Sequence, residues 1–275
     1  MKTTCKQQCI ILVLVASLFM FTACQNEDTT SDAVEEVAID DQLAQRSAEI
    51  DLIADDIDFI VEEGFIEDET YIYFLPDCVT ITTQISSGFR ERTVDFGTGC
   101  ELPNGNLLSG MITMSHEVDS DPARRTVSVT FTNFERNGVS VEGTRSIERV
   151  LANTAGNPQA TASVDMQVTW PNGATYTRQG TRVREWIEGF GSGTWSDNVF
   201  SITGNVTTTN ILGNTYAATI TTALRRELVC AFIVSGTISL SRNNDTGTLD
   251  FGNGSCDNEA TWTNPSGTVQ TIFLD

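Results

Sequence analysis

Beyond Tyr71 the chain alternates apolar and polar residues with a period of two, and this pattern continues to its end. The clearest stretch is residues 126–132, in which Val127, Val129 and Phe131 alternate with hydroxyl side chains. Successive side chains of a strand point to opposite faces of a sheet, so the alternation predicts strands with one buried and one solvated face. No helical segment in this region is long enough to connect parallel strands, so we expect an antiparallel sheet.

Residues that tolerate positive φ, as tight hairpin turns require, lie between these runs. They are Ser87-Gly88, Asn137-Gly138, Asn172-Gly173, Gly213-Asn214, Asn243-Asn244-Asp245 and Ser266-Gly267. Pairing each run with the next predicts one all-β domain over residues 70–275, an antiparallel meander of about 13 strands. A meander of this size forms a sandwich or an open or closed barrel.

One helix is predicted before the sheet, over residues 47–64. Its apolar residues fall at Ile50, Ile53, Ile57 and Ile60, which is helical spacing, and acidic residues fill the gaps. Gly64 is a typical C-terminal stop. A single amphipathic helix cannot bury its own apolar stripe, so we expect it to lie on the sheet as a plug or a lid.

The first residues have the parts of a secretory signal: Lys2 and Lys6, then a largely apolar run over residues 10–21. That run is too short to span a membrane, which takes about 20 residues. Residues 21–24, Phe-Thr-Ala-Cys, resemble the lipobox of bacterial lipoproteins, with Phe in place of the usual Leu. We therefore predict a signal peptide over residues 1–23 and lipidation of Cys24; the alternative is an ordinary signal peptide with Cys24 as a bystander.

The acidic residues after Cys24 resemble an export tag of surface lipoproteins, so the predicted address is the outer membrane, with the protein facing either the cell surface or the periplasm. Residues 25–77 contain 18 acidic residues and one arginine, Arg46, whereas residues 78–275 contain 13 arginines. We interpret residues 24–46 as a solvated acidic tether. This charge argues against a nucleic-acid partner, and no calcium-binding loop motif is present.

Removal of the signal and lipidation of Cys24 leave four cysteines, an even number that suggests disulfides outside the cytoplasm. Cys78 and Cys100 flank one predicted hairpin, and Cys230 and Cys256 flank another. Hairpin geometry therefore favours these two pairings. A zinc site made from all four thiolates is the rival, but it lacks the usual short Cys-x-x-Cys spacing.

The segment Asp95-Phe96-Gly97-Thr98-Gly99-Cys100 recurs as residues 250–256, Asp-Phe-Gly-Asn-Gly-Ser-Cys. With residues 76–82 and the Trp-Ile-Glu-Gly-Phe-Gly segment at 186–191, these turns resemble an uncharacterised family of secreted all-β bacterial lipoproteins. The resemblance covers most of residues 70–275. The resemblance implies an all-β fold and a location in the cell envelope. It implies no mechanism, because the family has no established activity. Asp95 and Asp250 occupy equivalent turns, so we expect both to accept backbone hydrogen bonds there.

Residues for catalysis are sparse. His116 is the one histidine of the chain, and it is expected on the surface or rim of a strand; no Gly-x-Ser-x-Gly motif accompanies it. Carboxylate pairs for glycoside hydrolysis can be drawn from Asp95 with Glu117, or Glu185 with Glu188. We predict no catalytic residue, no metal site and no cofactor, and so no enzyme.

Trp186, Phe190 and Trp195 lie in a glycine-rich segment and are candidate ligand-binding residues; alternatively they cover a core or a barrel end. The preferred function is a membrane-anchored lipoprotein that serves as a non-enzymatic binding or structural module. One alternative is a surface carbohydrate-binding accessory protein, which predicts that Trp186 and Trp195 are both exposed. The other is a carrier of lipid or another apolar ligand in a half-closed barrel, which predicts an apolar cavity under the helix.

Overall fold

The computed structural model describes residues 39–64 and 75–275. The predicted signal peptide, the lipidation site Cys24 and most of the predicted tether lie outside the described residues. The helix, α1, is Asp41–Gly64. Oδ1 of Asp40 accepts the backbone N–H of Leu43 at 2.8 Å, a helix N-cap. The predicted start at residue 47 is therefore wrong, because Leu43 and Ala44 extend the buried surface of the helix into the supposed tether.

The sheet of the described residues has fourteen strands. In chain order they are β1 (Thr80–Ser86), β2 (Phe89–Asp95), β3 (Cys100–Glu101), β4 (Leu107–Glu117), β5 (Arg124–Arg136), β6 (Val139–Val150), β7 (Gln159–Thr169), β8 (Thr175–Glu188), β9 (Val199–Asn210), β10 (Thr215–Glu227), β11 (Ile233–Arg242), β12 (Asp245–Asn253), β13 (Glu259–Thr263) and β14 (Val269–Phe273). A short 3₁₀ helix, η1 (Trp195–Asp197), lies between β8 and β9.

Each strand pairs antiparallel with its neighbour in the chain, except that β2 and β3 both pair with β4. This confirms the predicted meander. The sheet does not close: β1 and β14 are its two edges. The prediction left a sandwich, an open barrel and a closed barrel as alternatives, and a single open sheet is found.

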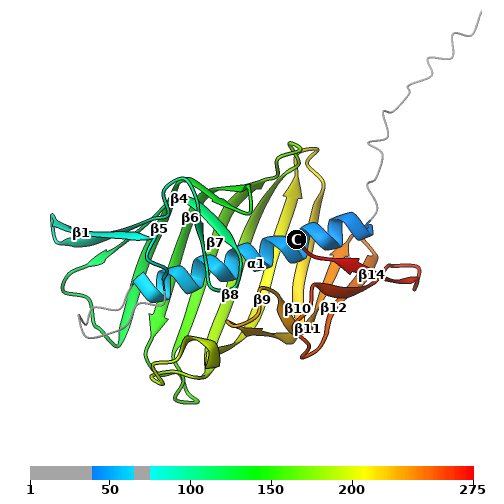
Figure 1. Ribbon diagram of the computed structural model, residues 1–275. Helices are drawn as coiled ribbons and strands as arrows, with labels where there is room; N and C mark the ends of the chain where they lie inside the picture. The colour runs from blue at the N-terminus through cyan, green and yellow to red at the C-terminus, as the bar shows by residue number, and fades with distance from the viewer. Residues whose placement is uncertain (1–38, 65–74) are drawn as a thin grey trace, which may run out of the picture. The chain divides into compact units, whose positions relative to one another are not determined.

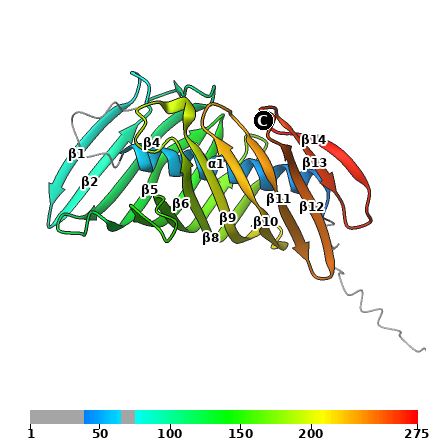
Figure 2. The same ribbon diagram turned by 90° about the horizontal axis from the view of Figure 1, so that it is seen from below.

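The sheet curls around α1, which crosses the strands on the concave side (Figures 1 and 2). Two glycines illustrate how the long strands bend. A Cβ on Gly143, at φ 112°, would lie 2.4 Å from the carbonyl oxygen of Asp165, and one on Gly180, at φ 146°, would lie 2.5 Å from that of Asn205. Both positions require glycine because neighbouring backbones approach closely.

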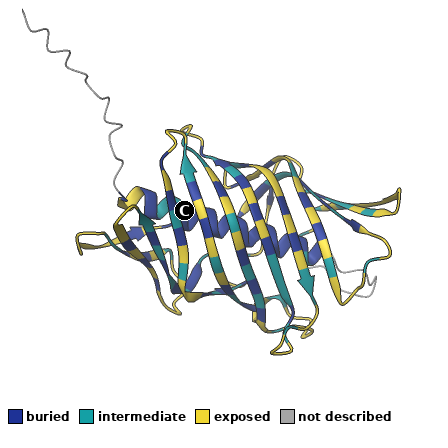
Figure 3. Cartoon of the chain, turned by 180° about the vertical axis from the view of Figure 1, so that it is seen from behind, coloured by how far each residue is buried: buried dark blue, intermediate teal, exposed yellow. Residues whose placement is uncertain are grey.

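Buried and exposed residues alternate along the strands (Figure 3). The buried ones form two apolar clusters. The C-terminal half of α1 packs on the strands from β2 to β8 through residues such as Ile53 and Ile57. The N-terminal half packs on the strands from β9 to β14 through residues such as Ala48 and Leu52, against Trp262. The helix thus provides the core of the curled sheet.

Both predicted disulfides are confirmed. Cys78–Cys100 closes the end of the β1–β2 hairpin, and Cys230–Cys256 closes that of the β11–β12 hairpin, at separations of 22 and 26 residues. Each bond lies where the two strands of a hairpin diverge, which is the geometry that the sequence spacing indicated.

The repeated turns also have the expected role. Oδ1 of Asp95 accepts the backbone N–H of Gly97 at 2.8 Å, and Oδ1 of Asp250 accepts that of Gly252 at 2.8 Å. Both carboxylates therefore stabilise a bend next to a disulfide.

Candidate functional site

The boundary between α1 and the sheet is ionic as well as apolar. Asp51, Asp55, Asp58 and Glu62 follow the helical spacing i, i+4, i+7 and i+11, so they share one side of α1. Asp55 is only 2% exposed. The sheet covers Asp51, Asp55 and Asp58, so this side of α1 does not face water.

Buried charges are segregated by sign. Among the described residues, every buried acidic residue belongs to α1 and every buried arginine belongs to the sheet. The arginines come from β5, β6, β8 and β10 and lie on the concave face: Arg136, Arg145, Arg178, Arg182, Arg184 and Arg226. We use the name acid–arginine seam for these six arginines together with five of the six buried acids of the described residues, namely Glu49, Asp51, Asp55, Asp56 and Asp58.

Single carboxylates of the seam bridge pairs of guanidinium groups. Asp51 lies 2.9 Å from both Arg178 and Arg182, which are four residues apart on β8. Asp55 accepts from Nε of Arg184 at 3.0 Å and from Nε of Arg226 at 2.7 Å. These contacts hold α1 to strands far from it in the chain.

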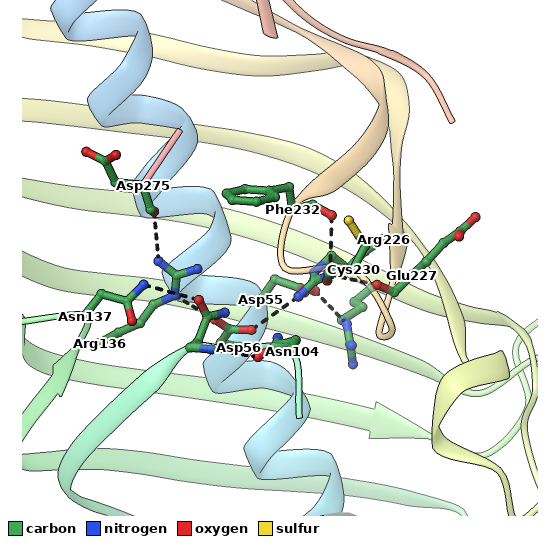
Figure 4. A network of polar contacts seen from close by, with 12 residues as sticks. Asp55, Asp56, Asn104, Arg136, Asn137, Arg226, Glu227, Cys230, Phe232 and Asp275 are labelled. Atoms are coloured by element: carbon green, nitrogen blue, oxygen red, sulfur yellow. Dashed lines mark hydrogen bonds and ion pairs between the residues drawn. The ribbon is translucent and has the colours of Figure 1, made fainter. Parts of the chain in front are cut away.

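The network continues around Asp56, because Arg226 also lies 3.4 Å from this carboxylate (Figure 4). Nε of Arg136 donates to Oδ2 of Asp56 at 2.7 Å, and the side-chain amide of Asn106 donates to the same oxygen at 2.9 Å. On the side of α1 that carries Asp51 and Asp55, Arg145 forms an ion pair with Asp58 at 2.8 Å and donates to the carbonyl oxygen of Ala54 at 2.9 Å.

The seam leaves some arginine donors unused. Nη2 of Arg136, Nε of Arg145, Nη1 of Arg182 and Nη2 of Arg184 are buried and have no hydrogen-bond partner. An unmet buried donor costs free energy, about 1–3 kcal/mol for a single group. Thus α1 neutralises the concave face without meeting all of its hydrogen-bonding capacity.

Two carboxyls of the seam differ in their response to burial. Burial raises the pKa of Asp51, but Arg178 and Arg182 together outweigh it and leave that pKa below its usual value. For Asp58, burial is also the largest effect, and Arg145 and Arg184 offset it incompletely, so its pKa is raised. Asp58 is therefore the less completely compensated charge of the two.

The apolar cavity expected under the helix is not found in the part of the chain that is described, because α1 itself fills the concavity. Beside Asp51, Asp55 and Arg182 there is only a void of about 10 Å³, which is about the volume for one water. A pocket of about 290 Å³ opens at the edge of the seam, between Arg46, Arg136 and the β7–β8 turn.

The three aromatic residues of the predicted ligand site differ in exposure, although the rings of Trp186 and Phe190 pack edge-on with their centroids 5.0 Å apart. Trp186 is 6% exposed, donates through Nε1 to the carbonyl oxygen of Glu188 at 2.7 Å, and packs on Phe200. Trp195 is half-buried and lies edge-on to Phe59 of α1, whereas Phe190 is exposed. The expectation that both tryptophans are exposed is wrong for Trp186, whose ring covers the core.

Of the carboxylate pairs considered for hydrolysis, Asp95 and Glu117 lie far apart, and Glu185 and Glu188 have other polar partners. Asp95 is opposite Met111 and Glu117 is opposite Phe89, so the two carboxyls lie at opposite ends of the β2–β4 ladder, about 20 Å apart at the usual rise per residue. Glu185 accepts from the side-chain amides of Asn153 and Asn157, which lower its pKa.

Glu188 instead pairs with Arg225 at 2.9 Å. His116 is buried rather than on the surface, and its Nδ1 lies 2.8 Å from the carbonyl oxygen of Glu117. In residues 39–64 and 75–275, no group of three or more histidine, cysteine or acidic side chains is placed to hold a metal ion. No helix in these same two ranges is long and apolar enough to cross a membrane.

Comparison with known proteins gives no relative. No protein-family model matches the chain, no curated protein matches its sequence, and no solved structure matches its fold. The seam therefore stands as the candidate site on its own chemistry.

Sequence reasoning missed the seam, although two signals point to it. The acids cluster before the sheet while 13 of the arginines lie within it. In addition, Arg178, Arg182 and Arg184 have even numbers on β8, so by strand periodicity they share a face with the buried Trp186.

Proposed function

We propose that the protein is a lipid-anchored lipoprotein of the bacterial envelope that binds rather than catalyses. In this proposal its binding surface is the concave face of the sheet, and α1 is a built-in occupant of that face. The seam is the observation that supports it: the sheet presents arginines and apolar side chains, and α1 supplies the matching acids and apolar side chains.

The energetics of buried ion pairs favour a removable plug. Replacing buried ion pairs by apolar residues of similar volume is often neutral or stabilising, so such pairs are a poor way to make a permanent core. Asp51, Asp55 and Asp58 give α1 a side that water solvates well when the helix is out. The unmet donors on Arg182 and Arg184 also mean that a different occupant can be hydrogen-bonded more completely than α1 is.

This arrangement differs from the lipid carrier expected from the sequence. No preformed cavity under a lid is needed, since the ligand would take the place of α1 itself.

Hydrogen–deuterium exchange of the full mature chain tests the plug. We expect the amides of α1 to exchange together and faster than those of β8, because α1 leaves while the sheet keeps its ladder bonds. Joining α1 to β2 by a Gly64→Cys and Val94→Cys disulfide should remove this opening. An added Cβ at residue 64 lies 3.6 Å from Cγ2 of Val94, and the flexible end of Met114, 2.6 Å from it, has to move aside. The single variant Gly64→Cys is the control. Equal exchange free energies for α1 and β8 in the unlinked chain would contradict the proposal.

Metabolic labelling with palmitate, followed by membrane fractionation, tests the address. The wild-type chain should take up label and sediment with outer membranes, and Cys24→Ala should do neither. Label retained in Cys24→Ala, or a wild-type chain released without lipid, would contradict the anchored address and leave the plug untouched.

A further inference from the structure

We propose that the ligand of the concave groove is a single-chain amphiphile with an oxyanion headgroup, a carboxylate or a phosphate. This proposal rests on the proposed function, since it names the class of molecule that would take the place of α1. It follows from what the groove recognises in α1.

The proposed headgroup site is formed by the guanidinium groups that surround Asp51 and Asp55. Arg178, Arg182 and Arg184 come from one face of β8 and are all at most 4% exposed. Two carboxylates of α1 occupy this region, and Nη1 of Arg182 and Nη2 of Arg184 remain without partners. An oxyanion with several acceptor oxygens can accept from both planar groups at once, which is the geometry that arginine favours.

The path for the chain begins at the same place. The small void beside Asp51, Asp55 and Asp58 is also lined by Ile202 and Leu224, together with Ile233. From there the second apolar cluster continues across the neighbouring strands through the buried residues Val206, Ile238, Leu240, Leu249 and Trp262. Charge and apolar surface therefore meet at one point, with arginines on one side and a continuous apolar strip on the other.

The chemical groups that α1 presents to the groove indicate an amphiphilic ligand. Peptide groups within a helix bond to one another, so α1 offers the groove chiefly carboxylates and alkyl groups. A molecule with one anionic group and one alkyl chain presents the same two features. Neutral glycans lack both the charge and the apolar length, and cationic amphiphiles have the wrong sign for these arginines.

The test is displacement of a fluorescent fatty acid, dansylaminoundecanoate, from the full chain with Cys24→Ala, which removes the chain's own acyl groups. The competitors share one tail: palmitate, hexadecyl phosphate, hexadecanol and hexadecyltrimethylammonium. We expect palmitate or hexadecyl phosphate to bind at least about tenfold more tightly than hexadecanol, and the cation not to bind. The stronger of the two anions identifies the headgroup.

Equal binding of palmitate and hexadecanol would overturn the oxyanion site. So would displacement by a synthetic peptide of residues 41–64 when none of the amphiphiles competes, because the groove would then be a site for acidic helices. If nothing binds although α1 opens in hydrogen exchange, the ligand class is wrong and the plug stands. If nothing binds and α1 does not open, the proposed function fails as well.

A variant locates the headgroup. Arg182→Gln should abolish the preference for palmitate over hexadecanol, whereas Arg124→Gln, at an exposed arginine of β5, should leave it unchanged. The ratio of two affinities is insensitive to a modest loss of stability. Should Arg182→Gln fail to fold, Arg182→Lys keeps the charge but loses the planar fork, and it should reduce the preference. An unchanged ratio in both variants would place the headgroup elsewhere.

Discussion

The two faces of the sheet are built from the same strands and differ in what they do with polar residues. On the convex face, hydroxyl side chains align across adjacent strands in register; one such row is Ser115, Ser128, Ser146, Ser163 and Thr181. On the concave face the polar residues are chiefly arginines buried against α1. The convex face meets water with rows of hydroxyl groups and with exposed charged side chains, whereas the concave face meets a helix with buried arginines.

Ion pairs occur on both faces, and their surroundings decide what they contribute. Arg124 and Glu148, on the outer face, lie 3.0 Å apart with side chains that are 65% and 46% exposed. Arg226 and Asp55 lie 2.7 Å apart with side chains that are 0% and 1% exposed. Water screens the first pair and can solvate either partner alone, whereas neither partner of the second can be left alone without cost.

The largest effect is expected at Asp55. Asp55→Ala leaves Arg184 and Arg226 buried without their shared carboxylate, and breaking a buried pair in this way costs about 3 to 5 kcal/mol. Urea denaturation of the two chains measures the difference. Glu148→Ala is the control on the convex face, where we expect a change of at most about 1 kcal/mol. Similar losses in the two variants would end the distinction between the faces.

The apolar part of the concave face should be nearly as sensitive. Ile57 is 0% exposed in the C-terminal half of α1, and Ile57→Ala removes buried methylene and methyl groups and leaves a cavity, at a cost of about 2 to 5 kcal/mol. Thr219→Ala, on the exposed face of β10, should change stability by less than about 0.5 kcal/mol. A loss below about 1 kcal/mol for Ile57→Ala would mean that α1 is only loosely packed.

The Cys230–Cys256 disulfide is connected to the acid–arginine seam, because the carbonyl oxygen of Cys230 accepts a hydrogen bond from Arg226. Replacing both cysteines with alanine should cost about 2 to 4 kcal/mol through the loop that it opens. Removing the Cys78–Cys100 bond opens a loop of similar length without touching the seam. In thermal unfolding, the double variant without Cys230–Cys256 should therefore be less stable than the double variant without Cys78–Cys100. The reverse order would show that the Cys230–Cys256 disulfide does not support Arg226.

The smallest effect is the dependence on pH, and it has opposite signs at two carboxyls of the seam. The raised pKa of Asp58 means that the folded chain binds its proton more readily, so wild type should gain stability relative to Asp58→Asn as pH falls from neutral toward 3.8. The lowered pKa of Asp51 gives the reverse: wild type should lose stability relative to Asp51→Asn as pH falls below 3.8. Urea titrations at several pH values measure both, and parallel curves would contradict the assignment.

The strands, their order and both disulfides could be predicted from the sequence, because strand periodicity and turn residues are local signals. A slip of one residue would turn Val127 and Val129 outward and Ser128 inward, so the hydrophobic pattern alone specifies the register of β5. The disulfide pairing followed from the position of each cysteine relative to a single hairpin.

The seam could not be read in the same way, because it depends on contacts between residues far apart in the chain. Spacing at i and i+4 is identical for a stripe of acids that faces water and for one that faces arginines. Strand alternation does place Arg178 and Arg182 with the buried residues of β8, but arginines are buried only when paired, and their partners lie on α1. Considering both patterns together would have predicted the match between helix and sheet.

The distance along the chain between the partners of the seam has a kinetic consequence. Of the described elements, α1 is synthesised first. Asp55 and Arg226 are 171 residues apart, so Asp55 cannot contact this arginine until β10 has been made. Contacts this remote make folding slow. Until then Asp55 lacks one of its two arginine partners, and the negative charge of this side of α1 disfavours premature association with other chains.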